Sequence, residues 1–269
     1  MLTLPKIIAI NAKHKIIGFD VDGVLIDSFI PVHLAFQLYA DRYGLAPQIT
    51  TEYVKKYCMV GTPRHIVSNF LNNFRSHLEE HGVDVDLLLG DKLAEEASYW
   101  ESSYQEISTD PLANEDAIQV LVYLRKLGYI IPLITSRTKT EITKNLQILE
   151  KKYRELLKVG KVDQVDSLYD IAICWNDVEP YGKPQPRSME LAIARLRDTG
   201  IIAVEETLIL SGIIFVGDGA SDMEFAKNIA GFGFYIESIT PFMGESDYAP
   251  DITFHNMAHL KESLQYLGR

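Results

Sequence analysis

The sequence contains few cysteines and no long apolar run. Only Cys58 and Cys174 are cysteines among 269 residues, which is too few for a disulfide framework and favours a reducing compartment. The longest apolar stretches are about five residues, far below the roughly 20 that a membrane-spanning helix needs. The N-terminal segment has no apolar stretch of signal-peptide length. We therefore expect a cytoplasmic protein that has no membrane partner.

Positive charge is also scarce. The chain has 26 Lys and Arg residues against 37 Asp and Glu, which gives a net charge of −11. Such a chain lacks the basic surface that nucleic acid or an anionic membrane would select, so we expect no nucleic-acid partner. Hydrophobic residues make up 47% and charged residues 23%, which is typical of a globular protein and excludes a disordered chain. An anionic substrate would need local cations to attract it.

Short apolar runs that end in polar or glycine-rich turns recur along the chain. They occupy residues 15–19, 129–134, 171–174, 213–216 and 232–236. Helical periodicity at 115–127, 139–157 and 186–197 separates several of these runs. Runs that are apolar throughout indicate strands buried on both faces. The alternation predicts an α/β fold with a doubly wound parallel sheet.

One long stretch between the first and second strands shows helical patterns only. Helices are expected at 32–43, 63–81 and 87–107, which makes the stretch too long for a simple crossover. We predict a helical cap domain at 29–108, inserted into an α/β core domain made of 1–28 and 109–269. The stretch 151–181 is longer than we expect, and the sequence gives it no role.

Two carboxylates follow the first strand. Asp20 and Asp22 are two positions apart, so they project together from the carboxyl end of that strand, where open α/β sheets bind ligands. Gly23 permits the sharp turn that comes next. Carboxylates leaving an apolar strand together are costly unless a cation or a shared proton compensates them.

A second carboxylate pair, Asp218 and Asp222, lies in the turn after the strand at 213–216. If this strand neighbours the first, four carboxylates converge on one pocket, and hard oxygen ligands in that number indicate Mg²⁺. The competing interpretation is the dinucleotide-binding pattern GxGxxG. Asp222 stands where its third glycine would be, and a carboxylate would repel a pyrophosphate.

Two further segments supply groups for an anion. Thr135 and Ser136 end the second strand, where a hydroxyl and neighbouring backbone N–H groups can hold a phosphate oxygen. Lys183 stands in the loop Gly182-Lys183-Pro184, just before a helix, and can neutralise a nucleophilic carboxylate and a substrate oxyanion.

The motifs DVDGVLIDS, LITSR, GKPQP and VGDGASD occur in this order. Together they resemble the four motifs of the haloacid dehalogenase superfamily, in the subfamily with a helical cap inserted after the first motif. The resemblance implies a Rossmann-like core and a Mg²⁺-dependent phosphatase that cleaves a small phosphomonoester through an aspartyl-phosphate. The expected partner is then a small phosphorylated metabolite.

The resemblance also implies a role for each motif residue. Asp20 would be the nucleophile, and Asp22 the acid that protonates the leaving oxygen and then the base that activates water. Thr135 and Lys183 would stabilise the transferring phosphoryl group. Asp20, Asp218 and the backbone carbonyl of Asp22 would ligate Mg²⁺, and Asp222 would ligate it or hold a water bound to it.

Asp22 also separates branches of the superfamily. The dehalogenases and the phosphonate-cleaving branch lack an acid at this position, so both are disfavoured. A sugar-phosphate mutase of the β-phosphoglucomutase type retains the acid and stays open as an alternative. Capped relatives often have a His twelve residues after the nucleophile, whereas this chain has Val32 there and His33 one position later.

Overall fold

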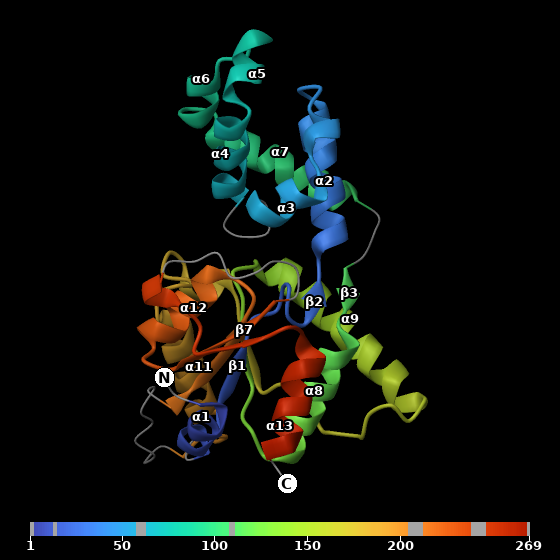
Figure 1. Ribbon diagram of the computed structural model, residues 1–269, viewed down its shortest axis with the longest axis vertical. Coiled ribbons are helices and arrows are strands. Elements are labelled where there is room, and N and C mark those ends of the chain that lie inside the picture. The colour runs from blue at the N-terminus through green and yellow to red at the C-terminus, as the bar shows by residue number, and fades with distance from the viewer. Residues whose placement is uncertain are drawn as a thin grey trace. The chain divides into compact units, whose positions relative to one another are not determined.

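The computed structural model describes residues 3–12, 15–57, 63–107, 111–203, 212–237 and 246–267. The chain divides into two compact units, which we call the core unit and the helical unit (Figure 1). The core unit consists of Met1–Asp27 and Leu112–Arg269, and the helical unit of Ser28–Pro111. None of the helices in the described ranges combines the length and the apolar character that crossing a bilayer requires.

A six-stranded parallel sheet forms the centre of the core unit, with the strand order β5-β4-β1-β6-β7-β8. The strands are β1 (Ile17–Phe19), β4 (Pro132–Ile134), β5 (Ile171–Ile173), β6 (Ile214–Gly217), β7 (Phe232–Ile236) and β8 (Ile252–Phe254). In β1 every residue is buried, as expected for a strand covered on both faces. Phe19 of β1 lies opposite Leu133 on one side and Val216 on the other. The predicted parallel α/β architecture is confirmed.

Helices bury both faces of this sheet. The first face packs against α1 (Leu4–Asn11), α8 (Glu115–Lys126), α9 (Lys139–Lys158) and α13 (Met257–Leu267), and the second against α10 (Trp175–Val178), α11 (Arg187–Asp198) and α12 (Ala220–Asn228). Successive side chains along a strand point to opposite faces of the sheet. Ile17 and Phe19 of β1 pack into the apolar core on the first face, and Ile16, just before β1, packs into the core on the second face. Figure 1 shows α8 and α13 on one side of the sheet and α11 and α12 on the other.

A short two-stranded ribbon marks the boundary of the core unit. Here β2 (Ile26–Asp27) pairs in an antiparallel way with β3 (Leu112–Ala113). Asn114 fixes the ribbon to α8, because its backbone N–H donates to the carbonyl of Leu25 at 2.9 Å and its side chain accepts the N–H groups of Asp116 and Ala117. The chain leaves the core unit after β2 and re-enters it at β3, so both crossings lie at one ribbon.

The helical unit has its own apolar core. Its elements are α2 (Phe29–Asp41), η1 (Ala46–Gln48), α3 (Thr51–Tyr57), α4 (Pro63–Asn73), α5 (Arg75–Glu80), α6 (Val85–Leu89) and α7 (Leu93–Glu106). Its buried residues are aliphatic and aromatic, and the aromatic ones include Phe36, Phe70 and Trp100. Glu96 is also buried there, and the hydroxyls of Tyr39 and Tyr43 each donate to it at 2.8 Å. These donors offset the cost of burying the carboxylate.

The structure corrects several predicted elements. The helix expected at 63–81 is two helices that meet at Phe74, and the helix expected at 87–107 is interrupted at Gly90. The expected strands did not include β8 or the ribbon of β2 and β3, whose strands have only two or three residues each. Helix α1 was also missed. It is attached to the core unit by the buried side chain of Asn11, which donates to the carbonyls of Ile16 and Gly212, both at 2.8 Å.

Candidate active site

The carboxyl ends of neighbouring strands bring the motif residues together. Asp20 follows β1, Thr135 follows β4 and Asp218 follows β6, and these three strands are adjacent in the sheet. The expectation that the strand at 213–216 neighbours the first strand is confirmed by the pairing of β1 with β6. The backbone N–H of Asp20 continues this pairing, since it donates to the carbonyl of Val216 at 2.9 Å.

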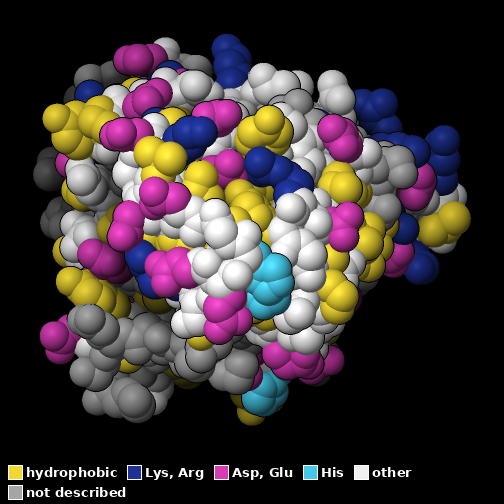
Figure 2. Space-filling view, turned by 90° about the horizontal axis from the view of Figure 1, so that it is seen from above, with side chains coloured by type: hydrophobic (Ala, Val, Ile, Leu, Met, Phe, Trp, Pro, Cys, Tyr) yellow, Lys and Arg dark blue, Asp and Glu magenta, His cyan; other side chains and the backbone are white. Residues whose placement is uncertain are grey.

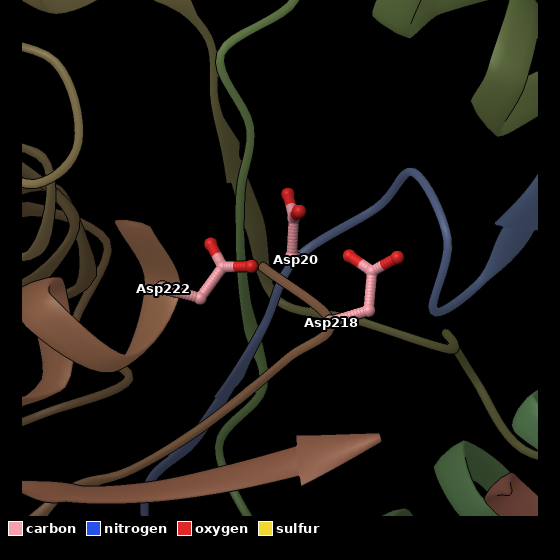
Figure 3. A group of neighbouring side chains, drawn as sticks. All are labelled: Asp20, Asp218 and Asp222. Atoms are coloured by element: carbon pink, nitrogen blue, oxygen red, sulfur yellow. The ribbon is translucent and has the colours of Figure 1, made fainter. Parts of the chain in front are cut away.

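Three carboxylates form one compact group in the described chain. Asp20, Asp218 and Asp222 each offer an oxygen, and these oxygens lie within 4.8 Å of one another (Figure 3). Asp222 reaches the group from the first turn of α12, where its Oδ2 accepts the backbone N–H of Gly219 at 3.0 Å. Asp20 and Asp222 are buried, with 9% and 2% of their surface exposed.

Lys183 contacts two of these carboxylates. Its Nζ lies 2.8 Å from Oδ1 of Asp20 and 2.6 Å from Oδ1 of Asp222. The lysine side chain is almost completely buried, with 4% of it exposed. Burial opposes its charge, but attraction by Asp20 and Asp222 is strong enough to raise the pKa of Lys183 above its ordinary value. The lysine is therefore a fixed positive charge in the site.

One ammonium does not balance three carboxylates. Burial raises the pKa of Asp20 to about 7, with Lys183 acting in the opposite direction and Asp222 and Asp22 adding repulsion. Burial, followed by repulsion from Asp222 and Asp20, raises the pKa of Asp218 well above its ordinary value. When all three carboxylates are ionised, Lys183 leaves two negative charges uncompensated, and three clustered oxygen donors with that excess suit a hard divalent cation such as Mg²⁺.

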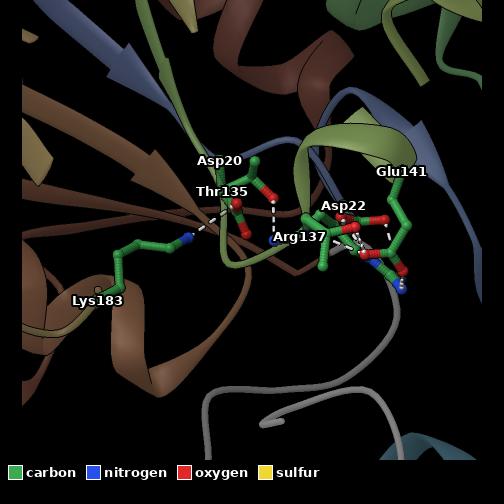
Figure 4. Close-up of polar contacts among 7 residues, drawn as sticks. Asp20, Asp22, Thr135, Arg137, Glu141 and Lys183 are labelled. Atoms are coloured by element: carbon green, nitrogen blue, oxygen red, sulfur yellow. Dashed lines mark hydrogen bonds and ion pairs between the residues drawn. The ribbon is translucent and has the colours of Figure 1, made fainter. Parts of the chain in front are cut away.

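The Asp22 carboxylate is not one of the three clustered carboxylates, although it lies near enough to repel Asp20 and Asp218. Arg137 binds it through two parallel contacts, from Nε to Oδ2 at 3.0 Å and from Nη2 to Oδ1 at 3.2 Å (Figure 4). Although Asp20 and Asp22 are two residues apart, separate cations hold them.

Thr135 and Ser136 differ in their surroundings. Thr135 is buried; its backbone N–H donates to the carbonyl of Ile173 at 3.0 Å, and its hydroxyl accepts the N–H of Arg137 at 3.1 Å. Ser136 is exposed. Phosphate binding by these two residues stays a prediction.

Gly23 fits the site because it has no side chain. Its φ of +75° lies in the left-handed region, and a Cβ there would stand 1.8 Å from Oδ2 of Asp218. Any other residue would displace the Asp218 carboxylate. The turn after β1 therefore needs glycine both for its conformation and for the approach of Asp218.

Sequence reasoning missed the roles of Arg137 and Glu141. Arg137 was visible only as the last residue of the motif LITSR, and nothing local indicates that it reaches Asp22, which is 115 positions away. Glu141 lies in the first turn of α9 and binds Nη1 of Arg137 at 3.1 Å. A capping pattern of Thr138 followed by Glu141 was the available signal for the second residue.

This chain belongs to the haloacid dehalogenase-like hydrolase family, whose sequence model matches residues 14–230. The matched region includes all three clustered carboxylates, together with Lys183 and Arg137. A search of curated proteins found no match to the chain.

Solved structures share the fold. A haloacid dehalogenase-like hydrolase from Bacteroides fragilis is 20% identical with a TM-score of 0.65, and the alignment covers 91% of this chain and 99% of that one. A predicted phosphoglycolate phosphatase from Haemophilus somnus is 18% identical with a TM-score of 0.64, covering 93% and 98%. A protein assigned as a β-phosphoglucomutase from Thermotoga maritima is 15% identical with a TM-score of 0.57, again covering 93% and 98%.

Proposed function

We propose that this protein is a Mg²⁺-dependent phosphatase that cleaves a small phosphomonoester through an aspartyl-phosphate. The observation that carries the proposal is the contact of buried Lys183 with Asp20, inside a group of three carboxylates at the carboxyl edge of the sheet. A lysine and clustered oxygen donors are what positioning and neutralising a phosphoryl group require. The structures named as phosphatases share this fold, which agrees with the proposal.

In the proposed reaction Asp20 attacks phosphorus through a carboxylate oxygen. The bond between phosphorus and the ester oxygen breaks, and Asp22 donates a proton to the departing oxygen. Water then attacks the phosphorus of the acyl-phosphate while Asp22 accepts a proton from it. The bond from phosphorus to Asp20 breaks, which releases inorganic phosphate and regenerates the carboxylate.

The metal and the cationic side chain would share the charge of the transferring group. Asp20, Asp218, Asp222 and the backbone carbonyl of Asp22 would hold Mg²⁺, which supplies electrostatic stabilisation of phosphoryl oxygens when bound. Lys183 would bind a phosphoryl oxygen from the side of Asp20, and Thr135 and Ser136 would donate hydrogen bonds to the others.

We propose that the helical unit acts as a cap that selects the substrate. Its bounds are 28–111, whereas the sequence predicted a cap at 29–108. Its connection to the core unit supports this role. Both crossings lie at the ribbon of β2 and β3, and an isolated β-bridge joins Ile26 of β2 to Asp22. A hinge at that ribbon would couple movement of the unit to the loop that carries Asp22. The small number of cysteines favours a cytoplasmic location for the protein.

Phosphate release from a panel of about a hundred phosphorylated metabolites tests the proposal. We expect Mg²⁺-dependent turnover of at least one small phosphomonoester and none by Asp20→Asn, because an amide does not form the acyl-phosphate. The matched control is Asp163→Asn, which alters a surface carboxylate paired with Lys126. If Asp20→Asn turns over substrate at the rate of the unchanged protein, Asp20 is not the nucleophile.

A sugar-phosphate mutase is the second candidate, because Asp22 supplies the acid that such a reaction needs and the fold resembles that of the Thermotoga maritima protein. A mutase would need a bisphosphate activator and would interconvert two sugar phosphates. Steady release of phosphate without an activator supports the phosphatase instead.

A further inference from the structure

Two cationic side chains contact different carboxylates of the site. Lys183 contacts Asp20 and Asp222, whereas Arg137 contacts Asp22. Figure 4 shows Lys183 on one side of Asp20 and the pair of Asp22 and Arg137 on the other. The family motifs assign a task to Lys183, but the structure gives Arg137 an equally specific contact.

The contact between Arg137 and Asp22 is a two-point fork. The guanidinium donates from Nε and from Nη2, each to a different carboxylate oxygen, at 3.0 and 3.2 Å. Both side chains are largely withdrawn from water, with 20% and 22% exposed. Two parallel hydrogen bonds fix the plane of a carboxylate as well as its position, which a single contact does not do.

Arg137 is itself held at both ends. Its backbone N–H donates to the hydroxyl of Thr135 at 3.1 Å, and its Nη1 contacts Oε1 of Glu141 at 3.1 Å. The second oxygen of Glu141 accepts from the backbone N–H and the hydroxyl of Thr138, at 2.9 and 2.7 Å, at the beginning of α9. The guanidinium is therefore anchored to the framework of the core unit.

We propose that Arg137 is a positioning residue for Asp22, and that its anchored fork sets the orientation in which Asp22 exchanges a proton with the reacting oxygen. This inference rests on the proposed function, because it concerns the proton transfer assigned there to Asp22. A carboxylate has about four lone-pair sites, and the fork occupies two of them. The fork itself leaves two sites that a leaving group or a water molecule can use.

The dependence of rate on the leaving group tests this role. A good leaving group such as p-nitrophenolate departs with little help from an acid, whereas phenolate needs protonation more. The ratio of kcat/KM for p-nitrophenyl phosphate to kcat/KM for phenyl phosphate therefore measures how well Asp22 donates its proton. The parameter kcat/KM includes the departure of the leaving group and excludes the later hydrolysis of the acyl-phosphate.

For Arg137→Met we expect this ratio to rise by about 10-fold or more, because a misplaced acid costs most where protonation matters most. Asp22→Asn should raise the ratio at least as much. Glu141→Gln keeps the size of the side chain and leaves the fork in place, but weakens its anchor, so we expect a smaller rise. This second variant retains the test if Arg137→Met folds poorly.

Arg125→Met is the matched control. Arg125 donates to Oδ2 of Asp170 at 2.6 Å and is 21% exposed, which matches the burial of Arg137, but α8 carries it and the pair contacts none of the proposed catalytic groups. Loss of this pair should lower stability and leave the ratio unchanged. The control therefore separates general destabilisation from misplacement of Asp22.

Several results would overturn the inference. If Arg137→Met lowers kcat/KM equally for both esters, Arg137 binds phosphate or supports the fold. If Arg137→Met hydrolyses both esters faster than the unchanged protein, the fork restrains Asp22 instead of positioning it. The proposed function fails separately, when the unchanged protein hydrolyses neither ester nor any metabolite of the panel.

Discussion

Replacing Lys183 with methionine is the sharpest perturbation that the site offers. The change keeps most of the apolar stem and removes a buried ammonium that lies 2.8 Å from Asp20 and 2.6 Å from Asp222. Without it, two buried carboxylates and the nearby Asp218 have no compensating side-chain charge within the group. Nζ also lies 5.5 Å from the centre of the Phe215 ring, so the end of a methionine side chain would meet an apolar surface there.

The structure gives an expected magnitude for stability and for rate. Removing one partner of a buried ion pair typically costs about 3–5 kcal/mol. For a chain of this size that corresponds to a fall in the melting temperature of about 10 °C when EDTA is present. Bound Mg²⁺ would offset part of the loss by compensating the same carboxylates. The loss of one charge-stabilising donor should lower kcat by roughly 10²-fold or more.

Two assays and one control check these values. Phosphate release at saturating substrate gives kcat, and thermal unfolding with EDTA or with Mg²⁺ gives the stability. The control is Lys152→Met, which removes from α9 an ammonium that lies 2.7 Å from Oε1 of Glu115 of α8. An exposed pair of this kind contributes about 1 kcal/mol or less, so neither assay should change much. A Lys183→Met protein within twofold of the original kcat and with an unchanged melting temperature would refute our account of the site.

Two further results are expected. Gly23→Ala should weaken Mg²⁺ activation by about 10–100-fold, because a Cβ 1.8 Å from Oδ2 of Asp218 displaces that ligand. The control is Gly44→Ala, where φ is a similar +66° but nothing lies within 4 Å of the added Cβ. This variant should leave Mg²⁺ activation unchanged. Without metal, the raised pKa values of Asp20 and Asp218 mean that folding retains protons which the unfolded chain releases near pH 4. Stability in EDTA should therefore decline as the pH rises from about 4 to 7, and the stabilisation by Mg²⁺ should grow over the same range. If the difference in stability between the protein with Mg²⁺ and the protein with EDTA does not vary with pH, this reasoning is wrong.

The sequence by itself predicted the architecture of the core and which side chains the structure brings together in the candidate site. Buried parallel strands are apolar throughout, so β1 and β6 were recognisable from a few residues each. Asp20 and Asp218 directly follow such runs, and the carboxyl edge of a parallel sheet is where they had to lie. Local pattern was sufficient here because strand length, turn chemistry and the alternation with helices are all encoded within short windows.

Short or irregular elements were beyond this kind of reasoning. Strand β8 contains the exposed Thr253 and so is not apolar throughout, and the two-residue strands β2 and β3 are too short to show a period. The ends of helices inside the helical unit depend on how neighbouring helices pack, and the breaks at Phe74 and Gly90 carry only weak local signals. Tertiary packing decides such boundaries, because the intrinsic free energies of a continued and an interrupted helix differ little at these positions.

Only the tertiary structure decided how the charges are paired. Asp20 and Asp22 are nearly adjacent in sequence, and the sequence indicated only that a cation or a shared proton would compensate them; Lys183 contacts the first and Arg137 the second. These lysine and arginine side chains come from loops more than 100 residues away. Their reach depends on the order of strands β4, β1 and β6 and on the register between them, which sequence-local periodicity does not specify. The types of side chain were therefore readable from the sequence, while their contacts required the folded sheet.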